Sequence, residues 1–243
     1  MPDEYLPLYT GSRAEATRYG ELDDWDRSFR ENVCCARAIE KAVRDYAGED
    51  HNITPGCAQA VLDEYGFKRT GFVLAHTVRN LGPLVKPSPE ADAWSWQFDH
   101  FRDKDFGRYF EAQLSLADID AFIGQYQEAY QTLGLLGKEH CDPEKWQESL
   151  DGKVLLLSPN VLREKYWSVE NMLWLCTGGF GASPNARGRA VYAICLSDGE
   201  ETRWNRGDFV GVLDEKYLPE WATEKVEALR TPQQEQSDSP VMG

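Results

Sequence analysis

The sequence lacks any run of about 20 consecutive apolar residues, the length that a membrane-spanning helix needs. Its first ten residues, MPDEYLPLYT, contain neither the basic start nor the apolar stretch of a secretory signal peptide. These absences argue against a helical membrane protein and against secretion. We therefore expect a soluble protein of the cytoplasm.

Basic residues are scarce: 26 Lys and Arg stand against 41 Asp and Glu, for a net charge of −15 over 243 residues. This balance excludes a protein that coats nucleic acid, although binding of a duplex through one local patch stays open. Hydrophobic residues make up 42% of the chain, enough for a folded core. The acidity lies mainly in residues 1–150, with 16 basic and 27 acidic residues, whereas residues 151–243 hold 10 and 14.

Metal-binding and thiol-enzyme motifs are also missing. The four histidines are far apart, the six cysteines are irregularly spaced, and no CxxC, HxxxH or HExxH pairs them. We therefore predict no metal, no cofactor and free, mostly buried thiols. A nucleophilic Cys35 would need a nearby base such as His76, and a small buried cysteine is the simpler interpretation. No catalytic residue is assigned, and the balance favours a protein that is not an enzyme.

Residues 1–150 show the three-to-four-residue apolar spacing that is typical of helices. The longest stripe runs from Leu22 to Tyr46, and Gly48 can end its helix. Ser12 with Glu15 has the spacing of a capping box, and proline or capping signals begin the other helices. The predicted helices cover residues 12–20, 22–46, 55–66, 70–81, 88–101 and 115–133, with a short one from residue 142.

After Gly152, short apolar runs of strand length replace this pattern. Asp198-Gly199 predicts a two-residue hairpin loop, and Pro219 begins a last helix. The predicted strands cover residues 153–158, 171–177, 189–197, 200–204 and 208–213. We thus predict an α+β protein in which a helical, acidic region (1–150) packs on a small C-terminal antiparallel sheet with a final helix (151–230). A partly open barrel is the alternative form of the sheet, and residues 231–243 are predicted to be a disordered tail.

The segment TGGFGASPNARGR, residues 177–189, is rich in glycine and arginine. Amides of Gly178, Gly179 and Gly181 could approach an anion, and Arg187 and Arg189 could hold a phosphate or carboxylate. These five residues are the candidate ligand site. The spacing matches neither GxxxxGK[ST] nor GxGxxG, so a loop that needs positive φ angles is the competing interpretation.

Residues 103–151 hold 11 acidic and 4 basic residues. If Glu111, Asp118, Asp120 and Glu128 share one helical face, they imitate a row of phosphates and attract a basic protein partner. Charge that merely keeps the chain in solution is the alternative.

The N-terminal part also resembles a known family on residues distributed over positions 5–100. They are Tyr9, Ser12, Glu15, Gly20-Glu21-Leu22, Ser28, Asn32, Cys35, Ile39, Tyr65-Gly66-Phe67, Arg69, Val73-Leu74-Ala75 and Thr77. This combination is similar to an uncharacterised domain of unknown function that is carried on conjugative and other mobile elements of gut bacteria. The segment from Gly178 to Phe209 also resembles proteins of these elements. The resemblance implies a mobile-element setting and transfers no catalytic residue, and residues 84–87 and 90–92 depart from the pattern.

Together these features lead to one main hypothesis. The chain is a non-catalytic accessory protein of a mobile genetic element that binds, and inhibits, a host defence or nucleic-acid-handling protein, such as a nuclease, in the manner of an anti-CRISPR or antirestriction factor. The alternative is an enzyme or ligand-binding module that uses residues 178–189 for a phosphorylated or nucleotide ligand. A scaffold that only self-associates is a third possibility, so the oligomeric state stays open.

Overall fold

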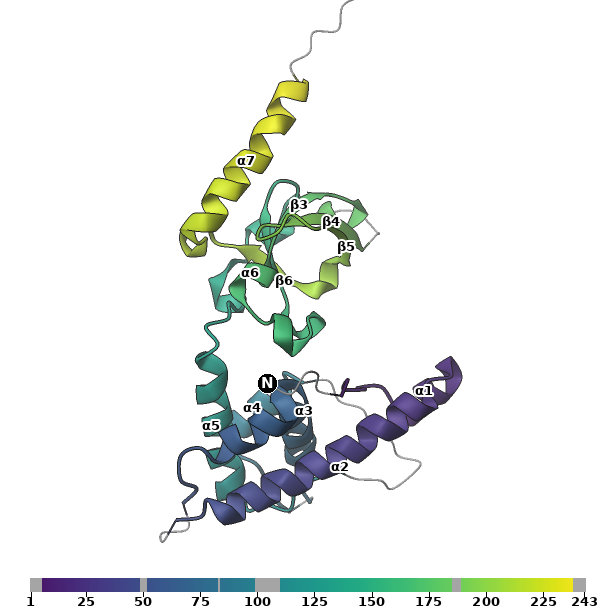
Figure 1. Ribbon diagram of the computed structural model, residues 1–243, viewed down its shortest axis with the longest axis vertical. Coiled ribbons are helices and arrows are strands. Elements are labelled where there is room, and N and C mark those ends of the chain that lie inside the picture. The colour runs from purple at the N-terminus through teal and green to yellow at the C-terminus, as the bar shows by residue number, and fades with distance from the viewer. Residues whose placement is uncertain (1–5, 49–51, 83, 99–109, 185–188, 238–243) are drawn as a thin grey trace, which may run out of the picture. The chain divides into compact units, whose positions relative to one another are not determined.

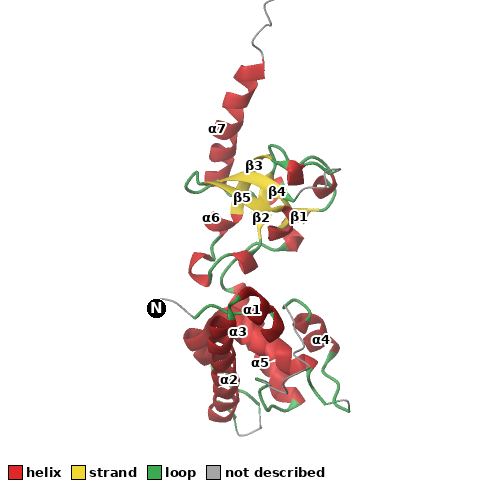
Figure 2. Ribbon diagram, turned by 90° about the vertical axis from the view of Figure 1, so that its right-hand side faces the viewer, coloured by secondary structure: helices red, strands yellow, loops and turns green. Residues whose placement is uncertain are grey.

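The computed structural model describes residues 6–48, 52–82, 84–98, 110–184 and 189–237, with side chains up to residue 230 (Figure 1). The chain forms two compact units, Met1–Thr132 and Leu133–Gly243. The first unit is helical and the second contains the strands, as the colours of Figure 2 show. The predicted α+β class, with N-terminal helices and a C-terminal antiparallel sheet, is confirmed.

Five α-helices form the described part of the N-terminal unit. Ser12 caps the first helix in a capping box with Glu15, and Ser115 caps the fifth with Asp118, as their spacing predicts. The helices are α1 (Arg13–Tyr19), α2 (Leu22–Asp45), α3 (Cys57–Arg79), α4 (Pro89–Ser95) and α5 (Leu116–Gln131).

Gly66 interrupts α3. Its φ of 75° and ψ of 171° are not helical, so two helical segments meet there at a kink. The predicted stop at Gly66 is therefore correct, but the second segment starts directly after it instead of at Thr70. The kink lets one long element bury residues on both sides of the break, from Val61 to Val78.

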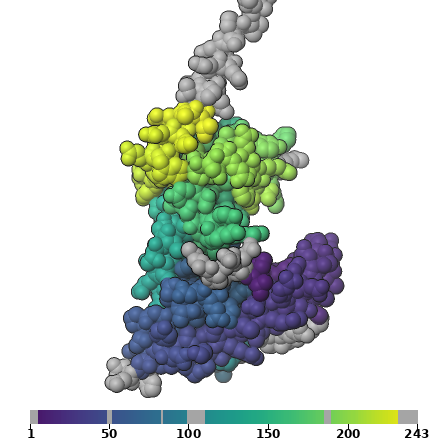
Figure 3. All heavy atoms as spheres, viewed as in Figure 1, coloured from purple at the N-terminus to yellow at the C-terminus, as the bar shows by residue number. Residues whose placement is uncertain are grey.

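The core of this unit lies between α2, α3 and α5. Ile39, Leu74 and Phe122 are fully buried and represent the three helices. The other face of α2 is open to solvent, and this helix, purple to blue in Figure 3, runs along the surface of the unit. The apolar stripe of the sequence thus marks the buried side of α2, and the remaining positions form its outer face.

The C-terminal unit is built on one antiparallel sheet with the strand order β1-β6-β2-β3-β4-β5, which is not closed into a barrel. The strands are β1 (Cys141–Asp142), β2 (Val154–Leu157), β3 (Leu173–Gly178), β4 (Ala190–Cys195), β5 (Glu201–Asn205) and β6 (Phe209–Leu213). Two α-helices, α6 (Val169–Met172) and α7 (Glu220–Ser237), accompany them. Short 3₁₀ turns cover residues 138–140, 145–147, 159–161, 164–166, 180–182, 206–208 and 215–217.

Both faces of the sheet are apolar because each is covered. On one face Leu156 packs in a cluster with Ala222 and Val226 of α7. On the other face Leu155 belongs to a cluster with Leu150 and Trp174. This double burial explains why β2 reads as an unbroken apolar run, VLLL, with all four residues buried.

The ends of the C-terminal unit differ from the sequence-based boundaries. The unit starts at Leu133 and not near residue 150, because β1 pairs with β6 and brings the preceding residues into the sheet. Helix α7 continues to Ser237, past the predicted start of the tail at residue 231, and residues 238–243 lie outside the described part. No helix in the described ranges is both long and apolar enough to cross a membrane.

Candidate functional site

The glycine-rich segment begins in the last two residues of β3, and its glycines allow close backbone packing. Gly178 and Gly179 have φ angles of 139° and 101°, which favour glycine. A Cβ atom on Gly179 would lie 2.5 Å from the carbonyl oxygen of Ala190, and one on Gly181 would lie 2.5 Å from that of Arg189. The competing interpretation, a loop that needs positive φ angles, is confirmed at Gly178 and Gly179.

The Arg206 side chain donates hydrogen bonds to the backbone of this loop. Its Nη1 donates to the carbonyl oxygens of Gly181 at 2.9 Å and Ser183 at 3.3 Å, and its Nη2 donates to that of Trp146 at 2.6 Å. The guanidinium carbon also lies 4.6 Å from the centre of the Trp146 ring. One charged side chain thus satisfies three carbonyl groups and ties residues 181 and 183 of the loop to residue 146.

Of the two arginines predicted to bind a ligand, the structure describes only Arg189. Arg189 is exposed at the end of the loop, and its carbonyl oxygen accepts a hydrogen bond from the amide of Arg206 at 2.7 Å. Arg187 lies outside the described residues. The anion-binding role of Gly178, Gly179, Gly181 and the two arginines stays a prediction.

Two exposed aromatic side chains lie in this loop and beside it. Phe180 is 78% exposed and Tyr192, on β4, is 51% exposed. The edge of the Tyr192 ring lies 3.1 Å from the position of a Cβ atom on Gly179, the residue before Phe180. Tyr192 also pairs across the sheet with the exposed Arg203 of β5. We call Phe180, Tyr192 and Arg203 the aromatic surface.

The N-terminal unit contains a buried polar cluster around Arg69 of α3. The Arg69 guanidinium donates to the carbonyl oxygen of Ser28 at 3.0 Å and to the side chain of Asn32, both on α2. It also donates to the carbonyl oxygens of Leu6 at 2.8 Å and Pro7 at 3.2 Å. We call Arg69, Ser28 and Asn32 the Arg69 clamp, because they tie the segment before α1 to two helices.

The comparison with family models agrees with this division. A model described as Protein of unknown function (DUF3849) matches residues 8–131, about half of the chain. The chain belongs to the DUF3849 family. The matched range contains α1 to α5 and the Arg69 clamp, so the DUF3849 domain corresponds to the N-terminal unit, whereas the aromatic surface lies outside it. Neither a curated protein nor a solved structure matches the chain.

The four predicted acidic residues of the DUF3849 domain do not form one row. Asp118 and Asp120 are two positions apart on α5, which places them about 160° apart, on nearly opposite sides of the helix. Asp118 accepts from the Ser115 hydroxyl at 2.7 Å and Asp120 accepts from the Ser88 hydroxyl at 2.7 Å. Glu128 is exposed, and Glu111 precedes α5. Their role in binding a partner stays a prediction.

His76 and Cys35 of the DUF3849 domain have different surroundings. His76 stacks on Phe110 with ring centres 4.1 Å apart, and its Nε2 lies 3.9 Å from Glu111 Oε1. Burial raises the pKa of the Glu111 carboxyl. Burial also raises the pKa of the Cys35 thiol to about 12, against the opposing effects of a Thr70 hydrogen bond and the charge of Arg69. Cys35 is therefore a protonated, buried thiol at neutral pH.

Thiol labelling checks this assignment. Cys34 is exposed, Cys141 is half-buried, and the other four cysteines are buried. We expect iodoacetamide at pH 8 to modify Cys34 at least tenfold faster than Cys35, measured by peptide mass spectrometry. Urea-unfolded protein, in which all six thiols are accessible, is the control, and equal rates for Cys34 and Cys35 in the folded protein would contradict a buried Cys35.

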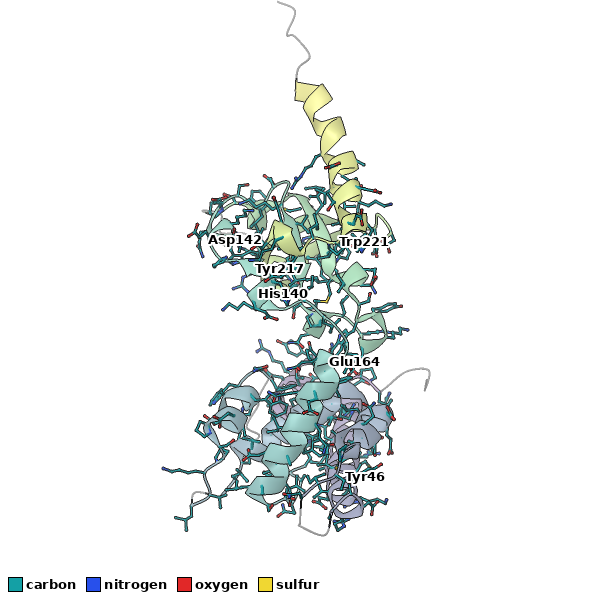
Figure 4. All side chains as sticks on the ribbon, turned by 90° about the vertical axis from the view of Figure 1, so that its left-hand side faces the viewer. Tyr46, His140, Asp142, Glu164, Tyr217 and Trp221 are labelled. Carbon is teal, nitrogen blue, oxygen red and sulfur yellow. The ribbon has the colours of Figure 1, made fainter. Side chains whose placement is uncertain are left out.

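The remaining histidine with a described position, His140, anchors the edge of the sheet. Its Nδ1 accepts a hydrogen bond from the amide of Gly137 at 2.9 Å, and its ring meets Tyr217 edge-on at 4.7 Å (Figure 4). The nearby Asp142 accepts from the amide of Glu144 at 2.9 Å. Two of these contacts are between near neighbours in the sequence, and the third joins the residue before β1 to the turn that follows β6. Within the described ranges, no three His, Cys, Asp or Glu side chains gather as a metal ion would require.

Proposed function

We propose that the protein is a non-catalytic accessory protein that binds another protein through the aromatic surface. The observation that supports this is the exposure of Phe180, at 78%, beside the half-exposed ring of Tyr192. Exposure of a large aromatic side chain to water is unfavourable, and aromatic residues and arginine are enriched at the centres of protein interfaces. The aromatic surface has this composition, because it combines two aromatic residues with Arg203.

The backbone under the aromatic surface also suits binding. The contacts of Arg206 and the close packing of Gly179 and Gly181 fix the backbone on both sides of Phe180. A preordered loop loses less conformational entropy on association than a flexible one. The ordered backbone around Phe180 therefore lowers the entropic cost of binding a partner at the aromatic surface.

The proposed partner is a host defence or nucleic-acid-handling protein, such as a nuclease. The resemblance of the sequence to a domain carried on mobile elements supports this choice. The net charge of −15 supports it as well, because nucleic-acid-binding clefts are basic and attract an acidic protein at long range. Since such partners act in the cytoplasm, we propose the same location for this chain.

The test is a titration of purified protein against a panel of purified defence nucleases, with complex formation and substrate cleavage as readouts. We expect at least one nuclease to bind and to be inhibited. The double variant Phe180→Ser/Tyr192→Ser should weaken binding by about 2 kcal/mol or more, roughly 30-fold. Tyr166→Ser is the matched control, because Tyr166 is 48% exposed in the same unit. Absence of binding across the panel, or equal losses in both variants, would contradict the proposal.

The exposed Arg189 at the end of the glycine-rich segment supports the alternative function, binding of a phosphorylated or nucleotide ligand. This alternative predicts that a nucleotide raises the melting temperature of the protein. The increase should disappear in Arg187→Ala and Arg189→Ala and persist in Phe180→Ser. An unchanged melting temperature across a nucleotide series favours protein binding.

A further inference from the structure

We propose that the outer face of α2 binds the backbone phosphates of a nucleic-acid duplex. Five basic side chains lie on this face, and all five are exposed: Arg27, Arg30, Arg37, Lys41 and Arg44. We call these residues the basic stripe. The chain as a whole is acidic, but this part of α2 is not. Between residues 27 and 44 there are five basic residues and two acidic ones, Glu31 and Glu40.

The spacing of the basic stripe places it on one side of the helix. Its members follow each other at intervals of three, seven, four and three residues, and the exposed Cys34 occupies the position left open between Arg30 and Arg37. At about 100° per residue, these positions fall within a sector of about 100°. With a rise of about 1.5 Å per residue, the stripe extends over about 25 Å of rigid helix.

Three residues of the basic stripe form ion pairs with acidic neighbours on α2, and these pairs are weak. Arg27 lies 3.5 Å from Asp24, Lys41 contacts Asp45, and Arg44 lies 4.0 Å from Glu40. Both partners of the first two pairs are exposed, and exposed pairs of this kind contribute little to stability. Phosphates can therefore replace these carboxylates at little cost.

The composition of the stripe favours phosphates over an acidic protein partner. Protein interfaces usually have an apolar centre, but the six exposed positions of the stripe are five cations and one cysteine. The aromatic residues of α2, Trp25 and Phe29, are buried and half-buried. Phosphate contacts need only charge and donors, and four of the five residues are arginines, whose guanidinium donates to two oxygens at once.

The duplex offers a matching array of charges. It carries one negative charge per about 1.7 Å of its axis. A stripe about 25 Å long therefore faces more phosphates than it has basic side chains, and each of the five side chains can contact one. The acidic rest of the chain repels the duplex over a distance that salt sets, about 8 Å at physiological ionic strength and longer at low salt, so this repulsion weakens the binding in every condition tested. We therefore expect local, weak and strongly salt-dependent binding, in contrast to a nucleic-acid coat.

The experiment measures the fluorescence polarisation of labelled 20-base-pair DNA and RNA duplexes with the full-length protein over a salt series. We expect binding at low salt, with log K falling against log salt by a slope of up to about −4.5. Arg30→Gln/Arg37→Gln should weaken binding at least tenfold and reduce the slope by about 2. The DNA and RNA arms show which duplex is preferred.

The control is Lys138→Gln/Lys225→Gln, which makes the same change in net charge at two exposed lysines of the C-terminal unit. This variant should bind the duplexes like the wild type, and unchanged melting temperatures show that both variants fold. The proposal is overturned if neither duplex binds at low salt, or if both double variants lose affinity equally. Stripe-dependent binding of poly-glutamate without duplex binding would also overturn it, in favour of an acidic protein.

Discussion

Replacement of Arg69 by methionine is expected to destabilise the DUF3849 domain by about 3 kcal/mol or more. Arg69 is only 3% exposed, and its guanidinium satisfies oxygens of Ser28, Asn32, Leu6 and Pro7. Methionine fills much of the space but donates no hydrogen bond. The change therefore leaves several buried acceptors unsatisfied and releases the segment before α1, which costs more than any one lost contact.

Hydrogen exchange on the full-length protein measures this effect in each unit separately. In Arg69→Met, amides of α2 and α3 should exchange at least a hundredfold faster, whereas those of β2 and β3 should not change. Arg37→Met is the matched control, because Arg37 is exposed on α2 and its loss should change stability by less than about 0.5 kcal/mol. Equal protection of α2 and α3 in wild type and Arg69→Met would show that the clamp contributes little.

The second large effect is expected at Gly71 of α3. A Cβ atom there would lie 2.2 Å from Phe98 Cε1 and 2.8 Å from the Tyr126 hydroxyl oxygen. Gly71→Ala must push apart α3, the Phe98 ring and α5, and overpacking of this kind typically costs about 1–3 kcal/mol. The expected result is a lower urea midpoint for the helical unit.

Gly124→Ala on α5 supplies a control of opposite sign. Nothing lies within 4 Å of the added atom there, so the gain in helix propensity should stabilise the protein by about 0.5–1 kcal/mol. Urea unfolding followed by circular dichroism compares the two substitutions. If Gly71→Ala is as stable as Gly124→Ala, the close packing of Phe98 on α3 is not present in solution.

Features of the fold that depend on neighbouring residues could be predicted from the sequence. The capping boxes at Ser12 and Ser115 and the apolar run of β2 are local patterns, and each is present in the structure. The two-residue strand β1 has no such pattern, because it exists only through its pairing with β6. The boundary between the units, at residues 132 and 133, has no local pattern either.

The candidate sites show the same division between local and distant contacts. Arg69 meets Leu6, 63 residues away, and Arg206 meets Trp146, 60 residues away, and no spacing rule connects such positions. The basic stripe has helical intervals that are present in the sequence. The net charge of the whole chain does not reveal it, because a sum says nothing about where the basic residues lie. The acidic row requires Glu111, Asp118, Asp120 and Glu128 to share one helical face, and the two-residue interval between Asp118 and Asp120 places these two on nearly opposite sides of α5.

The two units therefore present different surfaces. The DUF3849 domain carries the Arg69 clamp inside and the basic stripe outside, and the C-terminal unit carries the aromatic surface. Protein binding and duplex binding can accordingly be separated by variants in different units. Loss of one activity with retention of the other distinguishes the two proposals.

Side-chain oxidation by hydroxyl radicals, read by mass spectrometry, tests the central proposal most directly. In the free protein Phe180 and Tyr192 should be oxidised readily, because both rings are exposed. In the complex with a partner nuclease we predict at least fivefold protection of these two residues and unchanged oxidation of Tyr166. Protection of Tyr166 or of α2, with Phe180 and Tyr192 as reactive as in the free protein, would contradict the account.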